Sequence, residues 1–337
     1  MAQLNNALTL FFSLMVEAIP FLLLGVIFSS VLLLFVDERR LLRMVPKNAL
    51  LAALMGSFIG FLFPVCECGN VPVARRLIVQ GAPSAMAIGF LLAAPTVNPI
   101  VFWATWTAFR DQPEIVFLRI GLSLLIATIV GWVFSTQTDM RPLLQTTVAR
   151  SLPPPKAKPT TAESPLLQSG TYFLGQGNQP IRLDTSLETA ALIANPVLSK
   201  PFPDRLRLMA DNIVQELREL GGVLVIGTAI AAILQVAIPR DVVLSLGQGQ
   251  ITSIIAMMVL AWIVSICSTV DAFFALSFAA TFTTGSLLAF LVFGPMIDLK
   301  NIALLLSVFR SRAILYMFLL AGQLTFLLTL LINFYIS

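Results

Sequence analysis

Long hydrophobic stretches dominate this chain. They stand in place of the short amphipathic segments that are typical of a soluble protein. A membrane helix needs about 20 apolar residues to cross the hydrocarbon core of a bilayer. Segments of suitable character recur in both halves: 7–36, 49–65, 84–109 and 115–135, then 220–238, 250–266, 285–297, 300–311 and 313–335. The pattern predicts an all-α polytopic membrane protein with about eight to ten transmembrane or re-entrant helices.

The segment between the two hydrophobic halves differs in kind. Residues 136–217 hold 10 of the 20 prolines and 15 charged residues. Such a composition favours an extended or disordered tether. We therefore expect a first transmembrane repeat at 1–135, a flexible, cytoplasmic, proline-rich linker at 136–204, and a second transmembrane repeat at 205–337. An amphipathic helix is expected to start near Pro203 and to lead into the span at 220–238.

Polar and helix-breaking landmarks recur in the two halves at a nearly constant offset of 200 to 202 residues. The matched pairs are Glu17 and Glu219, Gly25 and Gly227, Cys66 and Cys267, Pro95 and Pro295, and Asn98 and Asp298. Paired broken segments in two halves of a membrane protein point to a transport site near the bilayer midplane. The spacing thus predicts two related halves.

The distribution of Lys and Arg predicts the orientation, because short cytoplasmic loops are enriched in them. The N-terminal tail has none, whereas the loop at 37–47 has Arg39, Arg40, Arg43 and Lys47. The N-terminus is therefore expected outside. If 66–82 crosses the membrane, each half has five passes, the linker is cytoplasmic and the halves are inverted, which the charges favour. If 66–82 is re-entrant, each half has four passes and the linker is external.

Composition and charge exclude several classes of protein and of function. Only 11% of residues are charged and 58% are hydrophobic, against about 25% charged in soluble domains. The net charge of +4 belongs to loops of a membrane protein and does not indicate a nucleic-acid partner. The chain has no histidine, which removes the imidazole base and the common catalytic zinc sites. With no nucleotide-binding motif either, we expect a secondary transporter and neither an enzyme nor a cofactor.

The most unusual segment is FPVCECGNVPVARRLIVQGAP at 63–83. Its prolines and glycines cannot all lie in one regular helix, and irregular backbone at membrane depth is tolerated where it lines protein or a cavity. Cys66 and Cys68 at this break can direct two sulfurs at one centre, and soft thiolates bind Cu(I), zinc or trivalent arsenic and antimony. Three cysteines without histidine disfavour a structural zinc. If the halves pack together, Cys267 joins them. The alternative is that these cysteines are small packing residues.

Four acids lie within or beside apolar segments: Glu17, Glu67, Glu219 and Asp271. Each charge costs about 2.5–3.5 kcal/mol on insertion scales, so acids here are functional candidates. We expect Glu67, Asp271 and Glu17 to carry protons. The alternative is a buried ion pair of Glu67 or Asp271 with Arg75 or Arg76. Glu219 ends an amphipathic run and is expected at the interface.

Arg75, Arg76 and Asn98 are further candidates for contacts with a solute. Guanidinium groups bind carboxylates and oxyanions in a bidentate manner, although arginines flanking helices also snorkel to the interface. The AAPTVNP segment at 93–99 breaks a helix, and Asn98 is expected to cap the half-helix that follows. That N-terminus would favour an anion. A simple kink is the alternative, and Asp298 takes the matching place in the second half.

Several of these segments together resemble the ArsP-type predicted permeases. The resemblance rests on PVCECGNVPVARRL (64–77), GAP (81–83), FLLAAPTVNPI (90–100), EAIPFLLLG (17–25), STVDAFFAL (268–276) and GPMIDLKN (294–301). It covers both hydrophobic halves and not the linker. It implies a permease, and since some members of the family export trivalent organoarsenicals on cysteines, it implies the same role for Cys66, Cys68 and, less directly, Cys267.

The expected function is therefore export of a small thiol-reactive solute, such as a trivalent organoarsenical bound by Cys66 and Cys68, with proton coupling. Three alternatives stay open: a membrane thiol oxidoreductase, transport of another small anion or metal ion, and a scaffold that docks a partner through the linker. The expected partners are a small-molecule substrate and the lipid bilayer, with the chain in the cell membrane. Homo-oligomerisation stays open.

Overall fold

The computed structural model describes residues 2–35, 45–46, 48–63, 66–137, 140–150, 172–174, 180–182, 202–237 and 249–336. Most of the predicted linker lies outside these residues, as do Pro64, the charged loop residues Arg39, Arg40 and Arg43, and Lys47. Within them the protein is helical apart from one short antiparallel pair, in which Tyr172 faces Arg182.

The described part of the first half contains α1 (Ala2–Phe35), α3 (Ala49–Leu62), α4 (Glu67–Val79), α5 (Ser84–Val97), α6 (Pro99–Ala108) and α7 (Pro113–Ser135). The short elements η1 (Arg141–Leu143), α8 (Thr146–Arg150), β1 (Tyr172–Leu174) and β2 (Pro180–Arg182) follow. The second half contains α10 (Phe202–Ala237), α12 (Gln250–Val264), α13 (Asp271–Leu276), α14 (Thr284–Met296), α15 (Leu299–Leu305) and α16 (Ser311–Ile336).

Six helical segments are long and apolar enough to cross a membrane, three in each half of the described chain. Pro20 lies within α1, which continues through this proline as one helix of 34 residues. The amphipathic segment expected near Pro203 and the following span form one continuous helix, α10. The fold is thus the predicted all-α multi-pass membrane protein.

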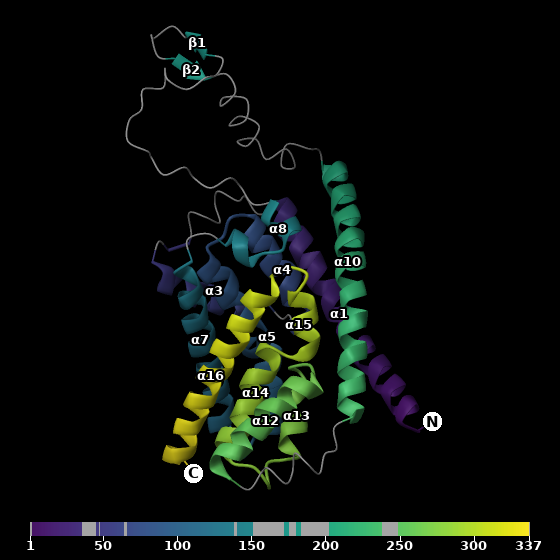
Figure 1. Cartoon of the computed structure of the whole chain (residues 1–337), viewed down its shortest axis with the longest axis vertical. Coiled ribbons are helices and arrows are strands. Elements are labelled where there is room, and N and C mark those ends of the chain that lie inside the picture. The colour runs from purple at the N-terminus through teal and green to yellow at the C-terminus, as the bar shows by residue number, and fades with distance from the viewer. Residues whose placement is uncertain are drawn as a thin grey trace.

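The described helices of the two halves follow in the same order, and the first long helices of the halves, α1 and α10, run in opposite directions. In Figure 1, α1 rises from the N-terminus at the lower right, whereas α10 descends beside it from the upper end. A long helix, two short helices, a broken helix and a final long helix follow one another in each half. This order is what inverted halves require, and a full superposition stays a prediction.

The helices α3 and α4 are short for a full crossing. They have 14 and 13 residues, about 21 and 20 Å at 1.5 Å per residue, whereas the hydrocarbon core is about 30 Å thick. Both lie in the upper part of Figure 1, while α12 and α13 lie in the lower part. Six segments have the length and composition of full spans, and the number of crossings stays a prediction. If these six cross and the N-terminus is outside, three spans leave the linker on the cytoplasmic side.

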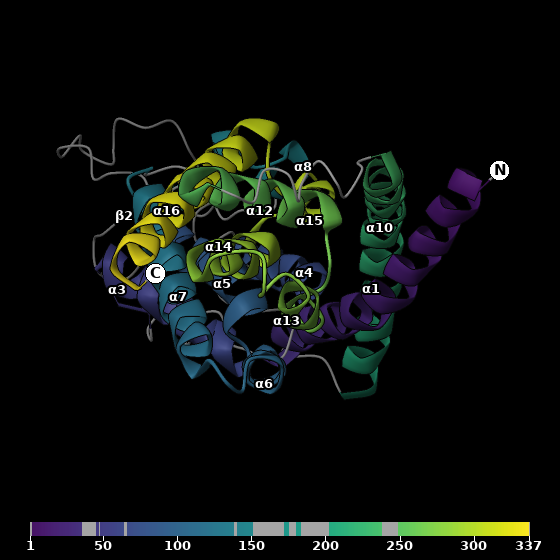
Figure 2. The same cartoon turned by 90° about the horizontal axis from the view of Figure 1, so that it is seen from below.

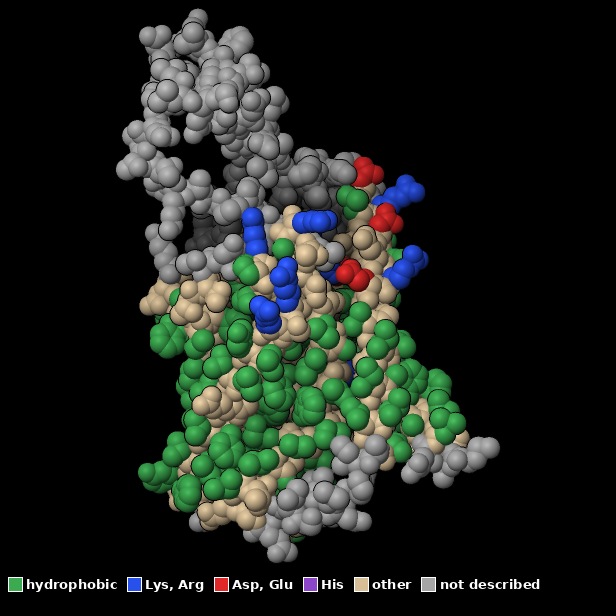
Figure 3. All heavy atoms as spheres, viewed as in Figure 1, with side chains coloured by type: hydrophobic (Ala, Val, Ile, Leu, Met, Phe, Trp, Pro, Cys, Tyr) green, Lys and Arg blue, Asp and Glu red, His purple; other side chains and the backbone are tan. Residues whose placement is uncertain are grey.

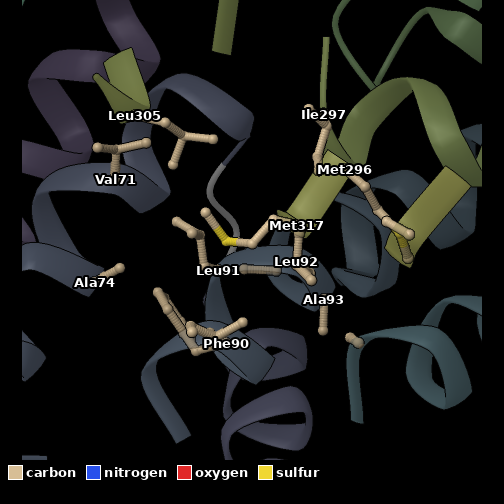
Figure 4. Close-up of a cluster of buried hydrophobic side chains, with 14 of the residues drawn as sticks. Val71, Ala74, Phe90, Leu91, Leu92, Ala93, Met296, Ile297, Leu305 and Met317 are labelled. Atoms are coloured by element: carbon tan, nitrogen blue, oxygen red, sulfur yellow. The ribbon is translucent and has the colours of Figure 1, made fainter. Parts of the chain in front are cut away.

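The centre of the molecule is formed by both halves. Viewed from below, α5 and α14 lie side by side, and α1 and α10 pair at one edge (Figure 2). Figure 4 shows buried side chains from α4 and α5, such as Val71 and Leu91, in one cluster with Leu305 and Met317 from the second half. The core is therefore shared, so neither half is packed without the other.

Glycines at matched positions let each long helix approach a half-length helix. A Cβ on Gly25 of α1 would overlap the backbone of Gly69 in α4. A Cβ on Gly227 of α10 would lie 2.7 Å from Cβ of Ala303 in α15. These two contacts fix α1 and α10 against the helices that carry the candidate site.

The surface agrees with insertion into a membrane. Hydrophobic side chains cover most of the face in Figure 3, and the visible Lys and Arg side chains gather near its upper end. The helix α4, which lies in the upper part of Figure 1, carries Arg75, and Arg75 forms an ion pair with Glu219 on α10. Because positive residues favour the cytoplasmic side, the upper end is expected to face the cytoplasm.

Candidate functional site

The CECG segment forms the beginning of α4. Cys66 is the residue before the helix, in extended conformation, and Glu67 and Cys68 lie in the first turn. The carbonyl of Cys66 accepts hydrogen bonds from Gly69 and Asn70, each at 3.1 Å. This start of a helix deep in the protein is the predicted break, and it holds both cysteines at fixed, buried positions.

Cys267 lies in the turn between α12 and α13, the corresponding break of the second half. The carbonyl of Cys267 accepts hydrogen bonds from Val270 at 2.9 Å and Asp271 at 3.1 Å. Ser265, two residues earlier, has a left-handed backbone with φ of 48°. The turn therefore directs the cysteine inward, towards α4.

Cys66 and Cys267 meet, as the repeat predicted. One ligand atom each of Cys66, Glu67 and Cys267 lies within 4.8 Å of the other two. The Cys66 thiol also interacts with Cys68, two residues along the chain. We call Cys66, Cys68 and Cys267 the thiol cluster. All three are unoxidised and nearly inaccessible to solvent.

Lys300 neutralises part of the acidic charge beside the thiol cluster. Its Nζ lies 3.0 Å from Oε1 of Glu67, and both side chains are almost fully buried. It also interacts with Cys68, Cys267 and Asp298. Within the described chain neither oxygen of Glu67 accepts a hydrogen bond of good geometry. Carboxylate oxygen thus stays available next to the sulfur atoms.

Glu17 approaches the same cluster from α1. Its carboxyl group is within hydrogen-bonding distance of the Cys267 thiol and interacts with Lys300 and Glu67. Its Oε1 is buried and has no hydrogen-bond partner among the described residues. The structure therefore brings Glu17, Glu67 and the thiol cluster together around one lysine.

Asp271 lies in a second, separate ion pair. Arg119 on α7 donates to both of its carboxylate oxygens, at 3.0 and 2.6 Å. Arg119 also donates to the hydroxyl of Thr105 on α6 at 2.8 Å. The sequence considered Arg75 or Arg76 as partners for the buried acids, and the structure corrects this: the partners are Arg119 and Lys300.

Arg75 and Arg76 lie in the second half of α4, away from the helix start that carries the cysteines. The guanidinium of Arg75 lies 3.1 Å from Glu219, and both side chains are partly exposed. A partly exposed ion pair is what we expect for an arginine and a glutamate that lie at the membrane interface. Neither arginine is brought to the thiol cluster, so contact of either with a solute stays a prediction.

Asn98 caps a half-helix, as predicted. Its Oδ1 accepts a hydrogen bond from the backbone of Val101 at 2.9 Å, at the start of α6. Asp298 caps α15 in the same way, accepting from the backbone of Asn301 at 2.5 Å. Both caps are buried. The broken helices therefore place two helix N-termini inside the protein, one on each side of the shared core.

Sequence reasoning missed Lys300 and Arg119. Each is a cation within an otherwise apolar helical segment, FLRIGLSLL for Arg119 and GPMIDLKN for Lys300. An ionisable residue in such a segment is a functional candidate with an expected partner. An ionisable residue in an apolar segment was thus enough to select Lys300 and Arg119 as candidates. Their partners could be identified only from the fold.

An apolar groove of about 540 Å³ lies elsewhere, between α12, α14 and α16, and includes Trp262, Phe293 and Gln323. None of the candidate residues lines it. Soft sulfur ligands, carboxylate oxygen and one ammonium group instead come together, buried, in and beside the thiol cluster.

Comparisons with known proteins show the family of the chain. The family model of the ArsP-type predicted permeases matches residues 3–334. The chain belongs to this family. The permease is 37% identical over 310 residues to the UPF0718 protein YcgR of Bacillus subtilis (strain 168), covering 92% of this chain and 90% of that protein.

A second relative of the permease carries a name that mentions a complex. It is the "Putative two-component membrane permease complex subunit" of Streptococcus mutans serotype c (strain ATCC 700610 / UA159), 32% identical over 310 residues, which are 92% of this chain and 89% of that protein. No solved structure matches the chain. The permease is thus an integral, multi-pass membrane protein of the cell membrane.

Proposed function

We propose that the permease exports a small thiophilic solute, with trivalent organoarsenicals as the preferred class. The observation that carries this proposal is the thiol cluster, in which Cys66 and Cys267 from different halves lie beside each other and beside Glu67. Soft trivalent arsenic prefers sulfur ligands. A site assembled from both halves is also the place where movement of the halves would change the ligands of a bound solute.

The binding chemistry is an exchange of ligands on arsenic. Methylarsenite, CH₃As(OH)₂, reacts with two thiols to form CH₃As(SR)₂ and two molecules of water. Each thiol loses its proton to a departing hydroxide, so charge and oxidation state do not change. Neighbouring carboxylates such as Glu67 can relay these protons.

Proton coupling is the second part of the proposal. The candidate carriers are Glu67 and Glu17 beside the thiol cluster, and Asp271 in its pair with Arg119. Buried charges are costly unless paired, so a carboxylate that changes partners during transport is expected to take up or release a proton. Asn98, Arg75 and Arg76 are proposed as accessory contacts for an anionic solute.

The test is transport into everted membrane vesicles with a panel of methylarsenite, arsenite, antimonite, Cu(I) and small carboxylates. We expect methylarsenite to accumulate in the vesicles. Dissipation of the proton gradient should lower this accumulation. Accumulation of only the carboxylates would contradict the proposal and favour the transport of another small anion.

The close approach of Cys66 to Cys267 also supports a second candidate, a membrane thiol oxidoreductase. That enzyme would pass through a mixed disulfide with its substrate. Trapping such an adduct on a single-cysteine variant, together with export that continues when Cys66 and Cys68 are both serine, would favour the oxidoreductase over the exporter.

The name of the Streptococcus mutans relative suggests a partner subunit. We propose that a second membrane component is an accessory of the permease, with the linker as a docking segment. Deletion of residues 151–200 should then abolish transport in cells, whereas an autonomous carrier would keep it.

A further inference from the structure

Lys300 connects the two segments that carry the thiols. Its Nζ lies 3.0 Å from Glu67, which stands between Cys66 and Cys68 in the first half. The same Nζ donates a hydrogen bond to the carbonyl of Ser265 at 3.2 Å. Ser265 opens the turn that carries Cys267. One ammonium group therefore bridges both sides of the thiol cluster.

The turn that Lys300 contacts is conformationally strained. Ser265 is the sole non-glycine residue with positive φ among the residues that the structure describes. A side chain disfavours this left-handed region, so the conformation persists only where neighbouring groups hold it. Two groups from the start of α15 do so: Nζ of Lys300 at the Ser265 carbonyl, and the backbone N–H of Leu299 at the Ser265 hydroxyl, at 3.2 Å.

No other described cation forms an ion pair with Glu67. Arg119 is engaged by Asp271, and Arg75 by Glu219. One side chain of the second half thus holds both Glu67 of the first half and the turn that carries Cys267.

We propose that Lys300 is a positioning residue that holds Cys267 against Cys66, so that a solute receives its third sulfur ligand only while the two halves are joined by this bridge. The inference rests on the proposed function for the identity of the solute. Separation of the halves breaks the Lys300–Glu67 contact, withdraws Cys267, and leaves the solute on two sulfurs. Loss of one ligand then releases a solute that three thiols would otherwise hold too tightly.

Cross-linking in the full-length protein without solute tests the positioning. Cys68→Ser leaves Cys66 and Cys267, which dibromobimane, a reagent for neighbouring thiols, should join. In that background we expect Lys300→Met to lower the yield about fivefold and Lys300→Arg to retain most of it, because a buried cation is needed at this place. Arg312→Met removes an exposed charge and should change nothing. Equal yields in Lys300→Met and its parent would overturn the proposal.

A rescue variant separates positioning from general damage to the fold. Glycine adopts the left-handed region readily, so Ser265→Gly should stabilise the turn without help from Lys300. We expect Ser265→Gly to restore cross-linking between Cys66 and Cys267 in the Lys300→Met protein. If the lysine variant fails to fold, the single variant Ser265→Gly should still cross-link as well as its parent. Failure of Ser265→Gly alone to cross-link would contradict the assigned turn.

Binding of two arsenicals then tests the consequence for the solute. Arsenite can use three thiols and methylarsenite two, so Lys300→Met should weaken arsenite binding about tenfold and methylarsenite binding less than twofold, because the third thiol acts as a tethered ligand. Equal weakening of both would overturn the proposal. If the parent protein binds neither arsenical but cross-linking depends on Lys300, the proposed function fails and the positioning role stands.

Discussion

Arg119 on α7 and Asp271 at the start of α13 form a bidentate ion pair inside the protein, with N–O distances of 3.0 and 2.6 Å. Its counterpart is the pair of Lys300 and Glu67. In each pair an acid in the first turn of a short helix meets a base from the other half of the chain. The two halves are therefore joined by two ion pairs of matched construction, one at each helix break.

The pair of Arg119 and Asp271 should contribute strongly to stability. Removing one partner of a buried ion pair costs about 3–5 kcal/mol, because the other charge is left uncompensated. We expect Arg119→Met to lower the unfolding temperature in detergent sharply, whereas Arg119→Met with Asp271→Leu should recover much of the loss. Arg312→Met, which removes an exposed arginine, is the control. A single variant as stable as the native protein would contradict a buried pair.

Asp271→Asn tests proton coupling at the same place. Asparagine keeps an oxygen that can accept from Arg119 but cannot exchange a proton. If Asp271 carries protons, transport by the variant should lose its dependence on pH while binding of the solute stays detectable in purified protein. If no detergent-stable protein can be recovered, the ion pair of Arg119 and Asp271 is instead needed for folding.

The thiol cluster should discriminate solutes by the number of thiols they need. Cys66→Ser and Cys68→Ser should each lower export of trivalent organoarsenicals in vesicles, since oxygen is a poor ligand for soft arsenic. Cys267→Ser should affect methylarsenite less than arsenite. Expression should stay normal in all three. An equal loss for solutes without thiophilic atoms would mean that the cysteines only shape the pathway.

Gly25 should tolerate no side chain. Because its Cβ position overlaps the backbone of Gly69, Gly25→Ala should destabilise the protein by about 1–3 kcal/mol through overpacking. Gly121 on α7 is the matched control, since nothing lies within 4 Å of its Cβ position. There, alanine should be neutral or stabilising, because it favours the helix. Thermal unfolding of the two variants in detergent measures the difference.

The orientation of the halves is testable by labelling. Single cysteines at Gln137, after α7, and at Gly249, before α12, placed in a variant with serine at the three native cysteines, should react with an impermeant maleimide from opposite sides of the membrane. One crossing by α10 between these positions requires this result. A cytoplasmic linker further requires that the cysteine at Gln137 is labelled from the cytoplasmic side and the one at Gly249 from outside. Labelling of both from the same side would exclude a crossing by α10, and labelling of the cysteine at Gln137 from outside would exclude a cytoplasmic linker.

Local features of the helix breaks could be predicted from the sequence, since they depend on neighbouring residues. Asn98 caps α6 because its side chain reaches a backbone N–H three residues later, which is a property of the segment PTVNP itself. The start of α4 at Glu67 likewise follows from the prolines and glycines around it. The number of crossings stays a prediction, because hydrophobicity alone does not distinguish a full span from a half-length helix.

The hydrophobic stretches by themselves determined that this is a helical, multi-pass membrane protein, because the length of an apolar segment is a local property; the two related halves stay a prediction from the spacing of the breaks. The partners of Glu67 and Asp271 required the tertiary structure. Lys300 and Arg119 lie far from these acids in the chain, and only the packing of α15 against α4 and of α13 against α6 brings each pair within contact. The proximity of Cys66 to Cys267 was inferred from the repeat. In the structure the same packing of the two halves brings these two cysteines, each at a helix break of its own half, close together in the buried interior.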